Sequence, residues 1–295
     1  MSRPAAIPDE ATAHDLRRAR LLVLLAAVLW SLAGVFIKHL ALHPLTIVFY
    51  RSFFASLFFA FFSKRSASIP RGPLLVAGVS YTVAISSFVA ANKLTTAANA
   101  IVLQYTAPIF VFIIVHFLFG EKIAGINWLA LCLGMIGIGV IFAGSVGQPD
   151  AAGVTIAVFS GLLFSIYMVS LRFLKEVSPG TLTFICNLAC WLILLPFVGS
   201  QLALSLNESL ILAVMGVVQL GMPYWLFSKS LQKVTVQEAS LIALIEPVLN
   251  PIWVALAVGE VPSRATLIGG ALIVVGLAVR YLWQLFNAAA DASRS

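Results

Sequence analysis

Apolar residues run through this chain in ten long stretches separated by short polar segments. The stretches cover approximately residues 19–39, 44–63, 73–92, 96–119, 126–145, 151–171, 180–199, 209–230, 236–258 and 265–286. An α-helix that crosses the hydrocarbon core of a bilayer needs about 20 apolar residues, and each stretch is close to that length. The pattern therefore predicts ten transmembrane helices, and the expected fold class is an all-α polytopic membrane protein.

Two of these stretches carry the same block of residues. The blocks are Pro108 with Gly120-Glu121 and Pro247 with Gly259-Glu260, and they lie 139 residues apart. Each block has a proline inside an apolar run that ends in Gly-Glu. Self-similarity at a fixed distance indicates that the chain contains two related halves.

The repeat also predicts how the two halves are oriented. Each half contains five helices, and because five is odd the second half must enter the membrane in the opposite direction. We expect an N-terminal tail over 1–18, a first repeat over 19–145, an inverted second repeat over 151–286 and a C-terminal tail over 287–295. Inverted halves are common in membrane transporters, where the substrate site lies between them.

Composition and charge support a membrane location. The chain is 61% hydrophobic and 10% charged, whereas soluble domains carry about 25% charged residues. With the N-terminus in the cytoplasm, 14 Lys and Arg residues fall on the cytoplasmic side and 3 on the outer side. Because Lys and Arg concentrate on the cytoplasmic side, both termini are expected there. Topology thus accounts for most of the net charge of +7, and nucleic-acid binding is not expected.

The three cysteines fall within predicted helices. Cys186 and Cys190 are one helical turn apart, and Cys132 is in the first half. No further soft ligand is near them in sequence, so we expect them to pack in the protein rather than bind a metal. No metal or cofactor is predicted.

Glu246 is the only acidic residue well inside a predicted span. A charged side chain at the bilayer centre costs at least about 2.5 kcal/mol, so it should face a cavity or a partner. It could bind a substrate ammonium group or carry a proton, or it could form a structural ion pair. Asn250 and Trp253 are spaced to lie on the same helical face and join it as candidate substrate-binding residues.

Four prolines predict interruptions in the helices: Pro108, Pro223, Pro247 and Pro251. Each removes a backbone N–H, and the carbonyls freed are those of Gln104, Gln219, Ala243 and Pro247. Unpaired backbone groups at membrane depth are tolerated where they line a cavity or other protein. Gln104, Tyr105 and Gln219 are therefore candidate cavity residues, and a kink sealed by a neighbouring helix is the alternative.

Arg51 and several aromatic residues are also candidates. Arg51 lies inside the second stretch, where it is expected to extend outward to the membrane surface or to form a structural ion pair. The alternative is that it contacts a substrate carboxylate. Trp30, Tyr81, Trp225 and Trp253 could stack on an apolar or aromatic substrate, although many membrane aromatics only face lipid.

Ten spans in two inverted halves, with a proline-bearing fourth helix that ends in Gly-Glu, resemble the drug/metabolite transporter superfamily of the EamA type. The resemblance runs from about Leu21 to about Phe286. Within the superfamily, the chain is similar to the bacterial aromatic amino acid exporters of the YddG type. This implies a central cavity lined by both halves and ATP-independent export of amino acids across the inner membrane by a single chain.

Two other functions remain open at this stage. One is proton-coupled efflux of drugs or other amphipathic metabolites, but the first span, Leu21 to His39, lacks the glutamate that small pumps of the superfamily carry there. The other is an intramembrane enzyme, which needs clustered reactive groups. Glu246 and His116 are far apart in the sequence and at unrelated repeat positions, so we expect no catalytic residues.

Overall fold

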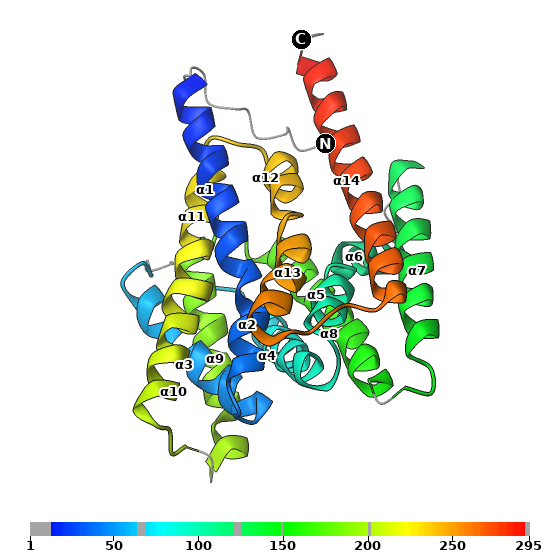
Figure 1. Cartoon of the computed structure of the whole chain (residues 1–295). Helices are drawn as coiled ribbons and strands as arrows, with labels where there is room; N and C mark the ends of the chain where they lie inside the picture. The colour runs from blue at the N-terminus through cyan, green and yellow to red at the C-terminus, as the bar shows by residue number, and fades with distance from the viewer. Residues whose placement is uncertain (1–12, 64–68, 121–124, 149, 200–201, 293–295) are drawn as a thin grey trace.

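The computed structural model describes residues 13–63, 69–120, 125–148, 150–199 and 202–292, and every regular element in these ranges is helical (Figure 1). The elements are α1 (Ala13–Ser31), α2 (Ala33–His39), α3 (Pro44–Ala60), α4 (Arg71–Leu94), α5 (Ala97–Gln104), α6 (Ala107–Phe119), α7 (Gly125–Ser145), α8 (Ala151–Ser170), η1 (Leu171–Phe173), α9 (Pro179–Val198), α10 (Leu206–Val214), η3 (Met215–Gly221), α11 (Met222–Ser230), α12 (Val236–Ala243), α13 (Glu246–Val258) and α14 (Arg264–Ala292). Among the described residues, nine helical segments are long and apolar enough to cross a membrane, and α3 is a tenth, shorter apolar helix. The predicted all-α polytopic fold is confirmed.

The internal repeat is visible in the helix boundaries. Helices α12 and α13 begin and end 139 residues after α5 and α6, respectively. Both pairs begin after a threonine cap, because the side chain of Thr96 accepts the N–H of Asn99 and that of Thr235 accepts the N–H of Glu238. Both end at a left-handed glycine, Gly120 at φ +65° or Gly259 at φ +75°. A left-handed C-terminal residue is most easily supplied by glycine, which explains the repeated Gly-Glu signature.

The same prolines interrupt both pairs in the same way. Pro108 and Pro247 each occupy the second position of the new helix, α6 or α13. A proline is tolerated in the first turn of a helix, where its missing N–H has no intrahelical partner, and it cannot continue the preceding helix. Pro251 behaves differently, because it lies inside α13 and the helix continues past it to Val258. The expected interruption at Pro251 is therefore wrong.

Helices α7 and α14 pack side by side (Figure 1) and display the two-fold relation between the halves. A Cβ atom added to Gly137 would lie 2.6 Å from the carbonyl oxygen of Gly269, and one added to Gly269 would lie 2.5 Å from that of Gly137. Ile273 covers Gly137 at 2.7 Å from that Cβ position, and Ile141 covers Gly269 at 2.6 Å. Each contact thus recurs with the two halves exchanged, as inverted repeats require.

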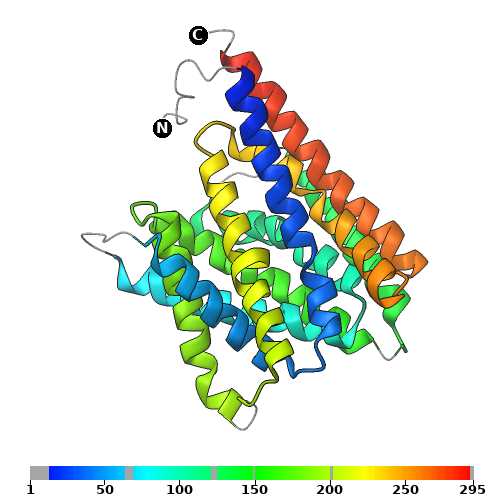
Figure 2. The same cartoon turned by 60° about the vertical axis from the view of Figure 1, so that its left-hand side comes forward.

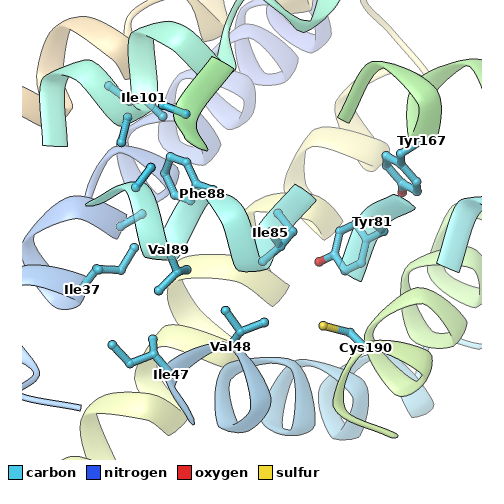
Figure 3. Close-up of a cluster of buried hydrophobic side chains, with 14 of the residues drawn as sticks. Ile37, Ile47, Val48, Tyr81, Ile85, Phe88, Val89, Ile101, Tyr167 and Cys190 are labelled. Atoms are coloured by element: carbon cyan, nitrogen blue, oxygen red, sulfur yellow. The ribbon is translucent and has the colours of Figure 1, made fainter. Parts of the chain in front are cut away.

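The apolar core joins helices of both halves. Figure 3 shows part of it, with Tyr81 and Tyr167 adjacent and Cys190 nearby. Helices α3 and α9 also make polar contacts, because Ser52 donates to the sulfur of Cys190 over 3.3 Å. Cys186 and Cys190 are buried free thiols in this core, whereas Cys132 is exposed. The groups of His, Cys, Asp and Glu in the described residues form no cluster that could hold a metal ion.

The start of α1 and the end of α14 lie at the same end of the bundle (Figures 1 and 2). We call this the terminal end, and we call the opposite end, where α2 ends and α14 begins, the far end. The two ends of the helical region can lie on the same side only if the chain crosses the membrane an even number of times.

Candidate functional site

A cavity of about 250 Å³ lies between the two halves and receives residues from both. It adjoins the two helix interruptions, because Gln104, Tyr105 and Pro108 line it from the first half and Ala243, Leu244 and Glu246 from the second. The backbone carbonyls that the prolines leave unpaired were expected to lie at a cavity, and both interrupted segments line this one. The interrupted helices therefore bring polar groups to one interior space.

Glu246 is the first residue of α13 and lines the cavity. Its carboxylate accepts a hydrogen bond from the hydroxyl of Tyr105 over 2.8 Å. The same hydroxyl lies 3.1 Å from the carbonyl oxygen of Ala243, the group that Pro247 leaves without its helical donor. A side chain of the first half thus serves both the acidic group and the freed carbonyl of the second half.

Arg51 in α3 also lines the cavity and is only 3% exposed. Its Nε is buried and has no hydrogen-bond partner in the part of the chain that the structure describes. The expectation that Arg51 extends outward is wrong, because the residue is buried and lines the cavity. The backbone of α3 packs closely against η3 at this point, since a Cβ atom on Gly216 would lie 2.6 Å from the carbonyl oxygen of Arg51.

Gln219 and Trp30 add two further polar groups to the cavity wall. The amide nitrogen of Gln219 donates to the carbonyl oxygen of Trp30 over 3.1 Å. Its amide oxygen and the indole N–H of Trp30 are both buried and have no hydrogen-bond partner within the described ranges. Donor and acceptor groups left unpaired on the wall of a cavity indicate a site that can bind a polar ligand.

The segment that carries Gln219 is not a simple break. Residues Met215–Gly221 form a π-helix, η3, directly before α11 and Pro223. Pro223 offers no N–H to the carbonyl of Gln219. The helix does not end there but continues through a wider π-helical segment, in which hydrogen bonds join residues five apart. Such π-segments often occur at functional sites, and this one directs Gln219 toward the cavity.

Aromatic side chains form much of the remaining wall. The ring of Trp30 packs against Tyr224 at 5.1 Å and Phe227 at 5.4 Å between ring centroids. Phe164 and Tyr281 line the cavity from α8 and α14. The sequence analysis did not select Phe164, Phe227 or Tyr281 as site residues.

One signal was available for part of this wall. Leu220, Tyr224 and Phe227 recur at spacings of four and three residues, which places them on one helical face. All three line the cavity. Tyr281 in α14 offered no comparable signal.

Asn250 and Trp253 do not reach the cavity. The amide of Asn250 donates to the carbonyl oxygen of Ser31 over 2.9 Å, and the indole N–H of Trp253 donates to the Ser31 hydroxyl over 3.0 Å. Ser31 ends α1, so both side chains hold the junction between α1 and α2 against α13. They share a face with Glu246 but lie further along α13, where α2 covers that face.

Tyr81 and Trp225 also lie elsewhere. Tyr81 lies in the core beside Tyr167 (Figure 3). Its hydroxyl donates to the amide oxygen of Asn187 over 3.2 Å. Trp225 is 37% exposed, with the ammonium group of Lys229 5.0 Å from the centroid of its ring. Four of the nine predicted contact residues are thus not brought to the cavity, whereas Glu246, Gln104, Tyr105, Trp30 and Gln219 are.

Polar contacts close the far end of the bundle. The Lys38 ammonium lies 2.5 Å from the carboxylate of Glu260 and donates to the carbonyl oxygen of Thr95 over 2.8 Å. The other oxygen of Glu260 accepts the backbone N–H of Ala97 over 2.6 Å. Lys93 donates to the carbonyl oxygen of Leu40. These contacts connect the ends of α2 and α4 and the start of α5 to the segment after α13.

The terminal end differs from the far end at an equivalent position of the repeat. Ala97 begins α5 at the far end and is 0% exposed, whereas Val236 begins α12 at the terminal end and is 61% exposed. Two residues with the same role in the repeat thus have opposite environments. The start of α5 is therefore buried beneath the polar contacts of the far end, whereas the equivalent start of α12 is exposed.

A polytopic bundle of two inverted halves, with a polar cavity where interrupted helices meet, is the architecture of a membrane transporter. The chain belongs to the EamA-like transporter family, whose model matches residues 17–143 and again residues 151–282. The two matches are the two repeats, so the EamA-type resemblance is confirmed. The more specific likeness to YddG-type exporters is not established by this match.

Relatives and a solved structure agree with this family. The chain is 33% identical to an uncharacterized transporter of Archaeoglobus fulgidus over 271 residues, which are 88% of this chain and 94% of the relative. It is 24% identical to the uncharacterized transporter YxxF of Bacillus subtilis over 271 residues, 87% of each chain. A crystal structure with 21% sequence identity covers 90% of this chain and 97% of its own, with a TM-score of 0.64, and shows that the fold is shared.

Proposed function

We propose that this protein is a secondary transporter that exports amino acids, chiefly aromatic or bulky neutral ones, across the inner membrane by alternating access. The observation that carries the proposal is the cavity between the halves, which combines the Glu246 carboxylate with an aromatic wall. No ATP is required in this proposal, and a single chain suffices because it already contains both halves.

The cavity chemistry matches this substrate class. A carboxylate recognises a primary ammonium group, and Trp30, Tyr224 and Phe227 offer surfaces on which an aromatic or apolar side chain can pack. A volume of about 250 Å³ is large enough for a ligand of the size of an amino acid.

The closure of the far end supports alternating access. Inverted halves can exchange conformations. A bundle whose far end is held together by polar contacts therefore has a related state in which the terminal end is held together instead. Because basic residues concentrate at the terminal end, we place that end and both termini in the cytoplasm. A substrate then enters from the cytoplasm and leaves when the contacts of Lys38 with Glu260 are broken.

Flux measurements in proteoliposomes test the proposal. Purified protein is reconstituted, and uptake or exchange of labelled phenylalanine, tryptophan, leucine, glutamate and lysine is followed with and without a pH gradient. We expect saturable flux of phenylalanine, tryptophan and leucine that exceeds flux of glutamate and lysine. Absence of flux for all five amino acids would overturn the substrate class and leave the transporter architecture intact.

Proton-coupled efflux of amphipathic cations is a second candidate. The observation that favours it is that the acidic residue lies beside aromatic rings, a combination that also suits organic cations. Flux of a labelled monovalent aromatic cation, driven by a pH gradient and absent for phenylalanine, would select this function over amino acid export.

A further inference from the structure

We propose that Arg51 is the carboxylate anchor of the cavity, so that the site holds an amino acid in one orientation, with its carboxylate at Arg51 and its ammonium at Glu246. This inference rests on the proposed function and adds to it the residue that determines specificity for substrates carrying both groups.

The environment of Arg51 requires an explanation. Arg51 lines the cavity and is 3% exposed, and its Nε has no hydrogen-bond partner among the described residues. Among the described residues, no ion pair is recorded between Arg51 and an acidic side chain, although Lys38 and Arg20 each have one. A buried guanidinium without a carboxylate partner is costly, which is unexpected for a residue with a purely structural role.

The carboxylate of a substrate supplies what Arg51 lacks. The guanidinium presents its donors in a planar fork that matches the two oxygens of a carboxylate. The buried indole N–H of Trp30, on the same cavity, is another unpaired donor available to an anionic group. Two residues of the cavity wall therefore carry a buried donor that has no partner among the described residues.

Arg51 and Glu246 can act at the same time without neutralising each other. Glu246 is held by the hydroxyl of Tyr105 at 2.8 Å, and it forms no recorded ion pair with Arg51. Both residues line the same cavity. A zwitterion bound between the two residues would satisfy both charges with no change in the net charge of the site.

The repeat indicates that a bound substrate has one orientation, because the two charged residues have neutral equivalents. Arg51 is contributed by the first half, and its repeat equivalent is Cys186, a buried neutral residue. Glu246 is contributed by the second half, and its repeat equivalent is Ala107, which lines the same cavity. The two-fold relation therefore offers no second pair of charges, and a substrate cannot bind in the reversed orientation.

Three ligands that differ only in their charged groups test this inference. Phenylalanine carries both groups, phenylalaninamide lacks the carboxylate, and 3-phenylpropanoate lacks the ammonium. Their affinities for the purified full-length protein are measured by ligand-induced change in tryptophan fluorescence and by inhibition of phenylalanine flux. Because hydrogen bonds to charged groups are worth about 1.5–3 kcal/mol, we expect wild type to prefer phenylalanine over either analogue by about ten- to hundredfold.

Variants then assign each group to a residue. In Arg51→Gln, phenylalanine should bind no more tightly than phenylalaninamide, while the preference over 3-phenylpropanoate is kept. In Glu246→Gln, the preference over 3-phenylpropanoate should be lost instead. Arg280→Gln is the matched control, because Arg280 is an arginine within a membrane helix whose Nε donates to Asn127 and which does not line the cavity.

The outcomes separate failure of the inference from failure of the proposed function. If wild type binds phenylalaninamide as tightly as phenylalanine, or if Arg51→Gln keeps the wild-type preference, Arg51 is not the carboxylate anchor. The wild-type comparison decides this even where the variant does not fold. If wild type neither binds nor moves phenylalanine or any other amino acid of the flux panel, the proposed substrate class fails first.

Discussion

At the scale of single residues, Tyr105 connects the two halves at the cavity. Pro247 leaves the carbonyl of Ala243 without a helical donor, and the hydroxyl of Tyr105 lies within hydrogen-bonding distance of this carbonyl and of Glu246. An unpaired carbonyl in a region without water is costly. Tyr105 therefore lines the cavity and also satisfies a backbone carbonyl that Pro247 leaves without a donor.

Glu246→Gln should reduce amino acid flux by about tenfold or more without preventing folding, because a neutral amide loses the charged interaction but can still accept from Tyr105. Flux in proteoliposomes and the amount of folded protein in the membrane are measured together. Glu208→Gln is the control, since Glu208 caps the exposed start of α10. A variant that is absent from the membrane would show that Glu246 is structural.

Tyr105→Phe should lower both stability and flux, because it removes the donor near Ala243 and Glu246 together. A buried group left unsatisfied costs about 1–3 kcal/mol, so a lower thermal midpoint is expected in detergent. Thermal unfolding of the purified variant and its phenylalanine flux are the measurements. Unchanged stability with unchanged flux would mean that the hydroxyl serves neither group.

At the scale of elements, proline and glycine decide how the helices bend and approach each other. Pro223 follows the π-segment η3 that directs Gln219 toward the cavity, whereas Pro108 and Pro247 begin new helices. Glycine allows helices to pack closely, because Gly137 and Gly269 let the backbones of α7 and α14 come into contact. The same residue types thus shape both the site and the scaffold around it.

Gly137→Ala should destabilise the protein by about 1–3 kcal/mol, because overpacking forces helices apart. The added Cβ would meet the carbonyl oxygen of Gly269 at 2.6 Å, a backbone atom that cannot move aside easily. Gly139→Ala on the same helix is the matched control, since its Cβ has no neighbour within 4 Å. The thermal midpoints of both variants are compared, and equal values would contradict the close contact.

At the scale of the whole molecule, the two ends of the bundle differ in burial at an equivalent position of the repeat. Glu260 joins the ammonium of Lys38 and the backbone N–H of Ala97 at the far end, where the start of α5 is fully buried. The equivalent start of α12 at the terminal end, Val236, is exposed. Transport by alternating access requires that these far-end contacts break in each cycle.

Glu260→Gln should shift the population toward a state that is open at the far end, because the ion pair with Lys38 and the charged acceptor for Ala97 are lost together. A cysteine placed at Ala97 in a cysteine-free variant reports this opening through reaction with a membrane-impermeant maleimide. We expect labelling several-fold faster with Glu260→Gln than without it. Equal labelling rates would show that Glu260 does not hold the far end closed.

The sequence by itself determined the local features of this protein. The length of each apolar run set the membrane helices, and proline and glycine chemistry set the interruptions before α6 and α13 and their ends at Gly120 and Gly259. These features depend on residues near each other in the chain. The repeat of one such pattern at a distance of 139 residues also determined the inverted architecture.

Only the tertiary structure decided which polar residues share the cavity. In lipid a helix can be apolar on all sides, so its pattern does not reveal which face meets protein. Glu246, Arg51 and Trp30 therefore meet at the cavity, while Asn250 and Trp253, on the same face of α13 as Glu246, bind the end of α1. The physical reason is that the orientation of each helix is set by the helices packed against it, and those partners are distant in sequence.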